Sequence, residues 1–221
     1  IMYFCKHLFL MMIMKQYAAY LFDFDYTLAD SSRGIVKCFR HVLECHGHTG
    51  ISDETIKRTI GKTLQESFSI LTGITQPDIL EAYRTEYVKE ADVHMTVNTT
   101  LYPETIEVLT TLKQKGSKIG IISTKYRYRI QELLSQHLPA GFMDIIIGGE
   151  DVKTAKPSPE GLLLACRNED TLYIGDSTVD AETAQTGKTD FVGILHGATT
   201  REELETYPHL FISPDLYALI R

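Results

Sequence analysis

The chain has 221 residues, 43% of them hydrophobic, which is enough for one well-buried domain and a smaller insert. Its formal net charge of -7 argues against nucleic acid as a partner bound by bulk electrostatics. The 4 cysteines form no C-x-x-C pair, which argues against a zinc knuckle or a thioredoxin-like site and favours the reduced thiols of a cytoplasmic protein.

The first 14 residues contain a short apolar run, residues 8–14. The run is as long as the apolar part of a signal peptide, but cleavage just after it would cut into the first expected strand. It is also shorter than the ~20 residues that span a bilayer. We interpret residues 1–14 as an extension with no role in the fold, with Met14 or a nearby methionine as the true start.

Five short runs rich in branched residues are typical of parallel strands buried on both faces. These runs are Tyr17–Phe22, Lys118–Ile122, Asp144–Ile147, Thr171–Ile174 and Phe191–Leu195. Amphipathic stretches between the later runs predict helices at about 103–116, 127–136, 159–166 and 179–186. The alternation predicts an α/β fold with a doubly wound, Rossmann-like parallel sheet.

Residues 31–96 differ, because their patterns are helical and contain no convincing strand. Thr63 and Glu66, for example, form a capping-box signature before an apolar run. We therefore predict a core domain of residues 15–30 and 97–221, interrupted by a helical cap domain of residues 31–96. An insert at this position would overhang the carboxyl ends of the strands, where open α/β sheets bind ligands.

Most residues whose side chains suit catalysis or ligand binding follow a predicted strand. Asp23 and Asp25 come after the first, Ser123 ends the second, Asp176 comes after the fourth, and Lys156 lies in the loop after the third. Because the carboxyl ends of parallel strands lie on one edge of a sheet, we expect these side chains to converge. Carboxylates are hard oxygen ligands that suit Mg²⁺, and the ion would neutralise both the acids and an incoming phosphate.

These residue types predict phosphoryl transfer. One aspartate of the pair can attack phosphorus, and a second, two residues on, can act as general acid and then as general base. Ser123 and Lys156 would hold the equatorial phosphate oxygens. Asp180, four residues after Asp176, is better placed as a supporting partner than as a metal ligand.

The motifs resemble those of the haloacid dehalogenase superfamily. D-x-D-x-T at residues 23–27, the serine at 123, K-P at 156–157 and G-D-x-x-x-D at 175–180 stand in that family's order. The resemblance extends from about Lys15 to Arg221, and the helical insert is similar to the family's type 1 cap.

The resemblance also implies roles for individual residues. It makes Asp23 the nucleophile and Asp25 the general acid and base. It implies a phosphate-binding set of Thr27, Ser123, Thr124 and Lys156, and Mg²⁺ ligands from Asp23, the backbone carbonyl of Asp25 and Asp176, supported by Asp180.

Within the superfamily the chain looks most like the phosphoglycolate phosphatases, because Leu101–Pro103, Gly148–Val152 and Lys156–Pro159 resemble segments of that group. The acid at position 25 favours a phosphatase or a phosphomutase. One departure is Tyr26, which stands where glycine is usual and either points to solvent or shapes the entrance to the site.

In the cap, Arg58, Gly61 and Lys62 resemble the family's loop that reaches down to the active site. A cation there could bind an anionic leaving group; the alternative is that Lys62 is a solvated loop residue. His41, His46 and His48 cluster near a helix end, but their spacing fits no zinc pattern, and we interpret them as surface histidines.

We expect a Mg²⁺-dependent phosphatase that hydrolyses a small phosphorylated metabolite, such as a phosphoglycolate-like monoester, through an aspartyl-phosphate. We expect a cytoplasmic monomer or weak dimer with no nucleic-acid or membrane partner. Three alternatives remain open: a β-phosphoglucomutase-like phosphomutase, an inorganic pyrophosphatase, and a non-catalytic phosphate-binding regulator.

Overall fold

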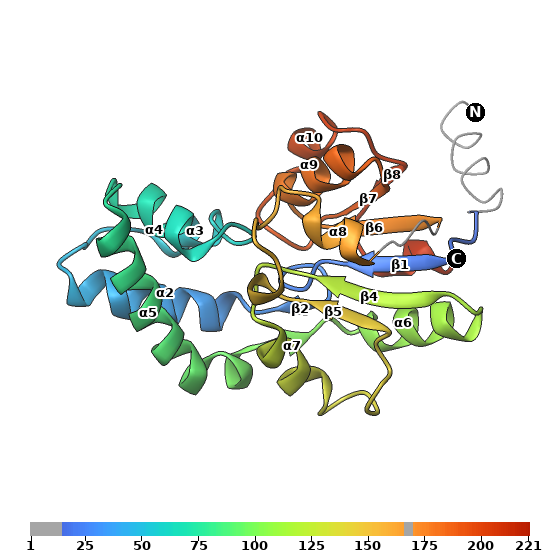
Figure 1. Cartoon of the computed structure of the whole chain (residues 1–221), viewed down its shortest axis with the longest axis horizontal. Helices are drawn as coiled ribbons and strands as arrows, with labels where there is room; N and C mark the ends of the chain where they lie inside the picture. The colour runs from blue at the N-terminus through green and yellow to red at the C-terminus, as the bar shows by residue number, and fades with distance from the viewer. Residues whose placement is uncertain (1–14, 166–169) are drawn as a thin grey trace.

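The core of the molecule is a six-stranded parallel sheet (Figure 1). The computed structural model describes residues 15–165 and 170–221, so the interpretation of residues 1–14 lies outside the described residues. The strands are β1 (Ala19–Phe22), β4 (Lys118–Ile122), β5 (Ile145–Ile147), β6 (Thr171–Gly175), β7 (Asp190–Ile194) and β8 (Phe211–Ser213), in the order β5-β4-β1-β6-β7-β8. The predicted α/β class with a doubly wound sheet is confirmed.

Helices cover both faces of this sheet (Figure 1). One face packs against α6 (Thr105–Gln114), α7 (Arg127–Leu134) and η3 (Leu216–Leu219), and the other against α8 (Glu160–Ala165), α9 (Thr178–Gly187) and α10 (Arg201–Leu204). Side chains along β1 alternate between the layers: Tyr20 and Phe22 belong to the first, Leu21 to the second. A register shift of one residue would exchange the layers, so this alternation fixes where each strand ends.

The sequence patterns missed three short strands. β8 (3 residues) lies between Pro208 and Pro214 and contains one branched residue, so it shows no run of the predicted kind. β2 (Ala29–Asp30) and β3 (Thr100–Leu101) pair antiparallel, apart from the main sheet. This small pair carries the chain out of the core and back, at the base of the helical insert.

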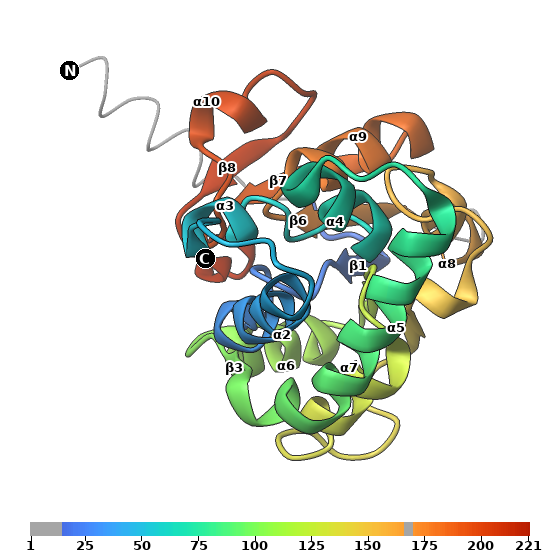
Figure 2. The same cartoon turned by 90° about the vertical axis from the view of Figure 1, so that its left-hand side faces the viewer.

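The insert consists of α2 (Ser32–Cys45), α3 (Asp53–Lys57), α4 (Leu64–Thr72) and α5 (Pro77–His94), followed by η1 (Thr96–Asn98). Its aromatic core is centred on Phe39, whose ring centroid lies 4.7 Å from that of Phe68 and 4.9 Å from that of Tyr87. The helices stand over the carboxyl end of β1 (Figure 2). We call this unit the cap.

The expected capping box at the start of α4 is half formed. The Thr63 hydroxyl accepts a hydrogen bond from the Glu66 backbone N–H at 3.2 Å. The Glu66 carboxylate, however, turns to Lys62 at 3.0 Å, because an ammonium group is a stronger partner than a backbone amide.

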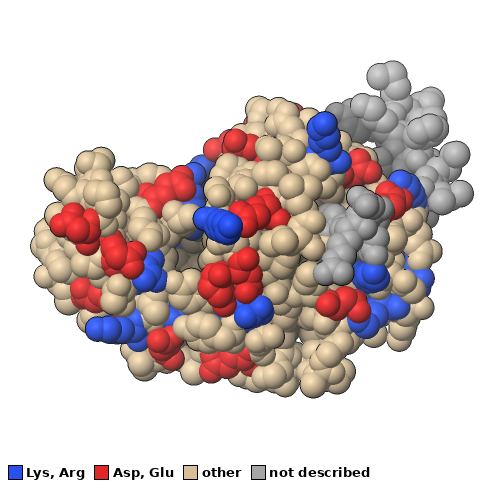
Figure 3. Space-filling view, viewed as in Figure 1, with Lys and Arg blue, Asp and Glu red and all other residues tan. Residues whose placement is uncertain are grey.

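The surface is mixed in charge. Lys and Arg side chains are interspersed with Asp and Glu over both cap and core on the face shown in Figure 3. Among the described helices, none is both long and apolar enough to cross a membrane.

Candidate active site

Three buried carboxylates converge at the carboxyl ends of β1 and β6. Asp23 follows β1, Asp176 follows β6, and Asp180 lies in the first turn of α9. One oxygen from each lies within 4.8 Å of the others, and the residues are 2%, 5% and 0% exposed. Lys156, also buried, joins them: its Nζ donates to Asp23 Oδ1 at 2.8 Å and to Asp180 Oδ1 at 2.6 Å. The sheet thus brings together side chains separated by up to 157 positions.

The electrostatics of this cluster favour binding of a further cation. Burial raises the pKa of Asp23 to about 7; Lys156 opposes the shift and Asp180 adds to it. Burial, reinforced by Asp180 and Asp23, likewise raises the pKa of Asp176 well above its usual range. Burial alone would lower the pKa of Lys156, but the attraction of Asp180 and Asp23 outweighs it and the pKa is raised. One ammonium group does not balance three ionised carboxylates, so a further cation is needed for all three acids to be ionised together.

The hydrogen bonds distinguish Asp180, whose carboxylate is held by its neighbours, from Asp23 and Asp176, whose oxygens could bind a metal ion. Asp180 Oδ1 also accepts from the Tyr173 hydroxyl at 2.9 Å, and its Oδ2 accepts from the Ser177 backbone N–H at 3.1 Å. Asp23 Oδ2, in contrast, accepts no hydrogen bond from any residue that the structure describes. Asp23 and Asp176 therefore offer hard oxygen donors that could hold a divalent cation, while Asp180 is occupied in positioning its neighbours.

Asp25 forms an ion pair with a different lysine, Lys125. Lys125 Nζ lies 2.8 Å from its Oδ1 and 3.1 Å from its Oδ2, and the Ser31 hydroxyl donates to Oδ1. The two acids of the D-x-D motif thus have separate cations, Lys156 for Asp23 and Lys125 for Asp25. This arrangement lets the two carboxylates differ in function although they are two residues apart.

Tyr26 does not point to solvent, so that alternative is wrong. The residue is 7% exposed, and burial raises the pKa of its hydroxyl to about 12. Its φ of 60° lies in the left-handed region, which explains why glycine is the usual residue at a turn of this shape. The turn is closed by the Tyr26 backbone N–H, which donates to the Ala29 carbonyl at 2.7 Å.

The predicted phosphate-binding residues surround the same region. Ser123 directly follows β4 and is buried; its hydroxyl accepts from the Lys125 backbone N–H at 3.3 Å. The Thr27 hydroxyl donates to Asp176 Oδ1 at 3.3 Å. Thr124 lines the space beneath the cap. Their roles in binding phosphate stay predictions.

A cavity of about 70 Å³ lies between the cap and the core. Asp25, Lys125 and Arg129 line it from the core, and Lys62 and Tyr87 from the cap. Arg129 is 6% exposed, and its Nη2 donates to the Val88 carbonyl at 2.8 Å. Its Nε has no hydrogen-bond partner within the described part of the chain. A buried guanidinium donor left unpaired beside a cavity is a candidate anion-binding group.

The three predicted cap residues lie at or near the contact with the core. Arg58 Nη1 contacts both carboxylate oxygens of Glu203 in α10, at 3.1 and 3.2 Å. Gly61 has a φ of 96°, and a Cβ added there would lie 3.4 Å from Ser177 Oγ. Lys62 lines the cavity while paired with Glu66. The loop at 58–62 therefore reaches the segment that carries Asp176, with the cap closed on the core.

Comparison with known proteins identifies the family. The family model for haloacid dehalogenase-like hydrolases matches residues 20–194, a range that contains every acid and lysine of the cluster. The chain belongs to the haloacid dehalogenase-like hydrolase family. A solved structure from Bacteroides fragilis, described as a haloacid dehalogenase-like hydrolase, is 61% identical with a TM-score of 0.91; the match covers 92% of this chain and 100% of that one.

Other proteins that resemble this chain carry different names. A pyrophosphatase PpaX from Bacillus mycoides is 30% identical over 192 residues, covering 85% of this chain and 87% of that protein. A structure from Lactobacillus delbrueckii subsp. bulgaricus, named for phosphoglycolate phosphatase, is 21% identical with a TM-score of 0.82 over 93% and 97% of the two chains, and so shares the fold. The expected enzyme class, a phosphatase of this family, is supported.

Some residues at the site of this haloacid dehalogenase-like hydrolase were not among those predicted from sequence. Arg129, in α7, belongs to none of the predicted motifs. Gly197 lies outside every motif, yet a Cβ there would lie 1.9 Å from Asp176 Oδ2. Only the three-dimensional approach of the loop after β7 reveals that contact.

Proposed function

We propose that this chain is a Mg²⁺-dependent phosphatase that hydrolyses small phosphate monoesters through an aspartyl-phosphate on Asp23. One observation carries the proposal: Asp23 is buried at the end of β1, ion-paired to Lys156 through Oδ1, while Oδ2 accepts no hydrogen bond from the described residues. An oriented carboxylate with one oxygen available is what attack on phosphorus requires.

The remaining side chains have consistent roles. Asp23 attacks phosphorus, and protonated Asp25 gives its proton to the departing alkoxide oxygen. Asp25 then takes a proton from the water that attacks the aspartyl-phosphate, which releases phosphate and restores both acids. Lys156 and Ser123 stabilise the charge on the phosphoryl oxygens.

The proposed Mg²⁺ site consists of the acids whose oxygens are available as ligands. Mg²⁺ would be held by Asp23, Asp176 and the backbone carbonyl of Asp25, and when bound it would neutralise charge on the acids and the phosphate. The donor set fits this ion, because every proposed ligand is a hard oxygen, and a cation would offset the burial and mutual repulsion that raise the pKa of Asp176.

The cavity favours a substrate with a second anionic group. Lys125 and Arg129 line it, and its volume of about 70 Å³ suits a leaving group of a few atoms. A phosphoglycolate-like monoester meets both conditions, because its carboxylate could pair with these cations. The proposed partner is thus a small phosphorylated metabolite, acted on by a cytoplasmic monomer or weak dimer.

Pyrophosphate is the second candidate substrate. Its leaving group is itself a small anion that suits the same cavity, and the name of the Bacillus mycoides relative supports this reaction. The phosphomutase and the non-catalytic regulator share the site residues, but no separate observation favours them.

The test is release of phosphate from phosphoglycolate, pyrophosphate and sugar phosphates with added Mg²⁺. We expect phosphoglycolate or pyrophosphate, the two small substrates with a second anionic group, to give the highest kcat/KM, and Asp23→Asn to reduce every rate to background. Asp53→Asn, an exposed cap acid paired with Arg40, is the matched control and should keep full activity. Undiminished turnover by Asp23→Asn would refute the mechanism.

A further inference from the structure

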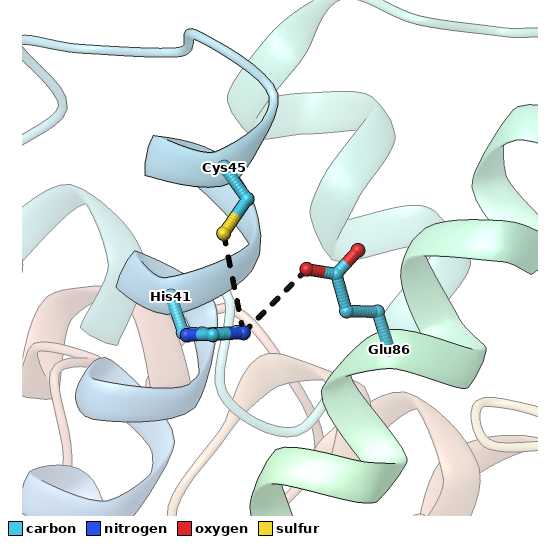
Figure 4. A group of neighbouring side chains, drawn as sticks. All are labelled: His41, Cys45 and Glu86. Atoms are coloured by element: carbon cyan, nitrogen blue, oxygen red, sulfur yellow. Dashed lines mark hydrogen bonds and ion pairs between the residues drawn. The ribbon is translucent and has the colours of Figure 1, made fainter.

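A second group of metal-binding side chain types lies on the cap, separate from the active-site acids. His41 and Cys45 are four residues apart on α2, so they share one face of that helix. Glu86 faces them from α5, and Figure 4 shows the three side chains pointing toward one another. No sequence motif joins these residues, because Glu86 is more than forty positions away from the other two.

The atoms are spaced almost as a metal ion would hold them. Cys45 Sγ lies 4.0 Å from His41 Nε2, which lies 3.6 Å from Glu86 Oε1. One ligand atom from each lies within 4.8 Å of the others. In a tetrahedral zinc site, with Zn–S of about 2.3 Å and Zn–N of about 2.0 Å, ligand atoms are about 3.3–3.6 Å apart. Small side-chain rotations on an exposed surface would close the difference.

A fourth residue orients the carboxylate. His46, which directly follows α2, places its Nε2 2.8 Å from Glu86 Oε2, while Oε1 faces His41. The His46 ring packs on Tyr83, with centroids 4.3 Å apart, which limits its rotation. Carboxylates that bind metals are commonly fixed in this way through their other oxygen.

We propose that the cap binds one zinc ion through His41 Nε2, Cys45 Sγ and Glu86 Oε1, with water in the fourth position. A thiolate is a soft ligand and an imidazole a borderline one, and together they select zinc-like ions over Mg²⁺ and Ca²⁺. Cys45 and His41 are both exposed, which leaves the group open to solvent for entry of the ion. The thiol proton passes to solvent as the ion binds.

The site would join the two longest helices of the cap. α2 leads from the core into the cap and α5 leads back, so an ion between them resists separation of the two helices. We therefore expect zinc to act on the stability of the cap, whereas the proposed Mg²⁺ at Asp23 and Asp176 acts on catalysis. The two metal sites share no residue, so the zinc site does not depend on the proposed function.

Calorimetric titration with Zn²⁺ in excess Mg²⁺ tests the proposal, with Co²⁺ absorption as the second measurement. Excess Mg²⁺ occupies the active-site acids. We compare the wild-type chain with Cys45→Ala and Glu86→Gln. His48→Gln is the matched control, because His48 Nε2 contacts the Tyr83 hydroxyl at 3.0 Å and not Glu86.

We expect the wild-type chain to bind one equivalent of zinc. Its zinc affinity should fall at least tenfold in Cys45→Ala and Glu86→Gln and be unchanged in His48→Gln. Zinc should also raise the thermal midpoint of the wild-type chain and of His48→Gln, but not of the other two variants. Co²⁺ should give a thiolate charge-transfer band that Cys45→Ala abolishes. Equal zinc affinity in wild type and Cys45→Ala, or an unchanged cobalt spectrum in that variant, would overturn the assignment.

Discussion

The ammonium group of Lys156 lies 2.8 Å from Asp23 Oδ1, and it lies 2.6 Å from Asp180 Oδ1. One buried cation is therefore shared by the proposed nucleophile and the acid that supports it. Because isolated buried charges are strongly disfavoured, each acid depends on this lysine to stay ionised. Stability and catalysis are coupled at this residue.

Replacing the lysine should damage both properties. We expect Lys156→Met to lower kcat/KM at least ~100-fold, the loss typical for one group that stabilises a developing charge. The free energy of unfolding should fall by about 3–5 kcal/mol, as when one partner of a buried ion pair is removed. Phosphate release and urea denaturation measure the two effects. Lys156→Arg keeps the charge and should unfold at higher urea than Lys156→Met; the reverse order would contradict this account.

Gly197→Ala should separate activity from stability. The added Cβ would meet Asp176 Oδ2 at 1.9 Å, and the end of a side chain can swing aside more easily than backbone. The displaced carboxylate would be a poorer ligand, so we expect the Mg²⁺ concentration for half-maximal activity to rise at least ~10-fold, in the range seen when metal-site neighbours are altered. The free energy of unfolding should change by less than about 1 kcal/mol. Thr199→Ala, in the same loop, should match the wild type in Mg²⁺ dependence.

The contrast between Asp176 and Gly197 shows how far the sequence could predict the site. Asp23, Asp176 and Lys156 lie at or beyond strand ends, and the topology of a parallel sheet brings such ends to one edge. Gly197 has no side chain, so no pattern could indicate that its backbone approaches a carboxylate. The fold class followed from runs rich in branched residues, whereas β8 (Phe211–Ser213) contains one branched residue and gave no such signal.

In the cap, too, contacts between elements could not be predicted from sequence patterns. The apolar spacing within α2 indicated a helix, since that information is local. The approach of Glu86 to His41 depends on how α2 and α5 pack, which spacing within either helix does not encode. For this reason the histidines near residue 45 resembled ordinary surface residues in sequence.

Tyr26 combines unfavourable backbone geometry with favourable burial. Its φ of 60° costs roughly 1–2 kcal/mol in a residue with a Cβ, while loss of a buried aromatic ring costs about 3–5 kcal/mol. We therefore expect Tyr26→Gly to lower the free energy of unfolding by about 1–4 kcal/mol. Tyr26→Ala loses the ring and keeps the strain, so it should be less stable than Tyr26→Gly by about 1 kcal/mol. Thermal denaturation of the pair decides this; equal midpoints would show that the strain is negligible.

The Arg58–Glu203 pair should affect cap closure more than folding. The two side chains are 54% and 44% exposed, and such pairs contribute about 1 kcal/mol or less to stability. Because they join the cap loop to α10, their loss should favour the open cap and raise KM several-fold in Arg58→Glu, with little change in the urea midpoint. The exchange Arg58→Glu with Glu203→Arg should restore KM. A double variant no better than Arg58→Glu would show that the contact does not hold the cap.

His196 should make stability depend on pH. Its ring packs on Tyr102 with centroids 3.9 Å apart, and its Nε2 lies 3.2 Å from Glu104 Oε1. Burial lowers the pKa of His196 below its usual 6.5, although attraction to Glu104 opposes the shift. The unfolded chain therefore takes up this proton at a higher pH than the folded one does. The stabilisation is present above about pH 6.5 and is lost as the pH falls.

We expect the unfolding free energy of the wild type to fall more steeply between pH 7.5 and 5 than that of His196→Gln, which keeps a donor for Glu104 but does not titrate. One proton limits the difference in slope to about 1.4 kcal/mol per pH unit. Urea denaturation at half-unit pH intervals measures both curves, and their difference removes the contribution of carboxylates common to the two proteins. Parallel curves would mean that His196 binds its proton equally well in the folded and unfolded chain, against the effect of burial that we infer.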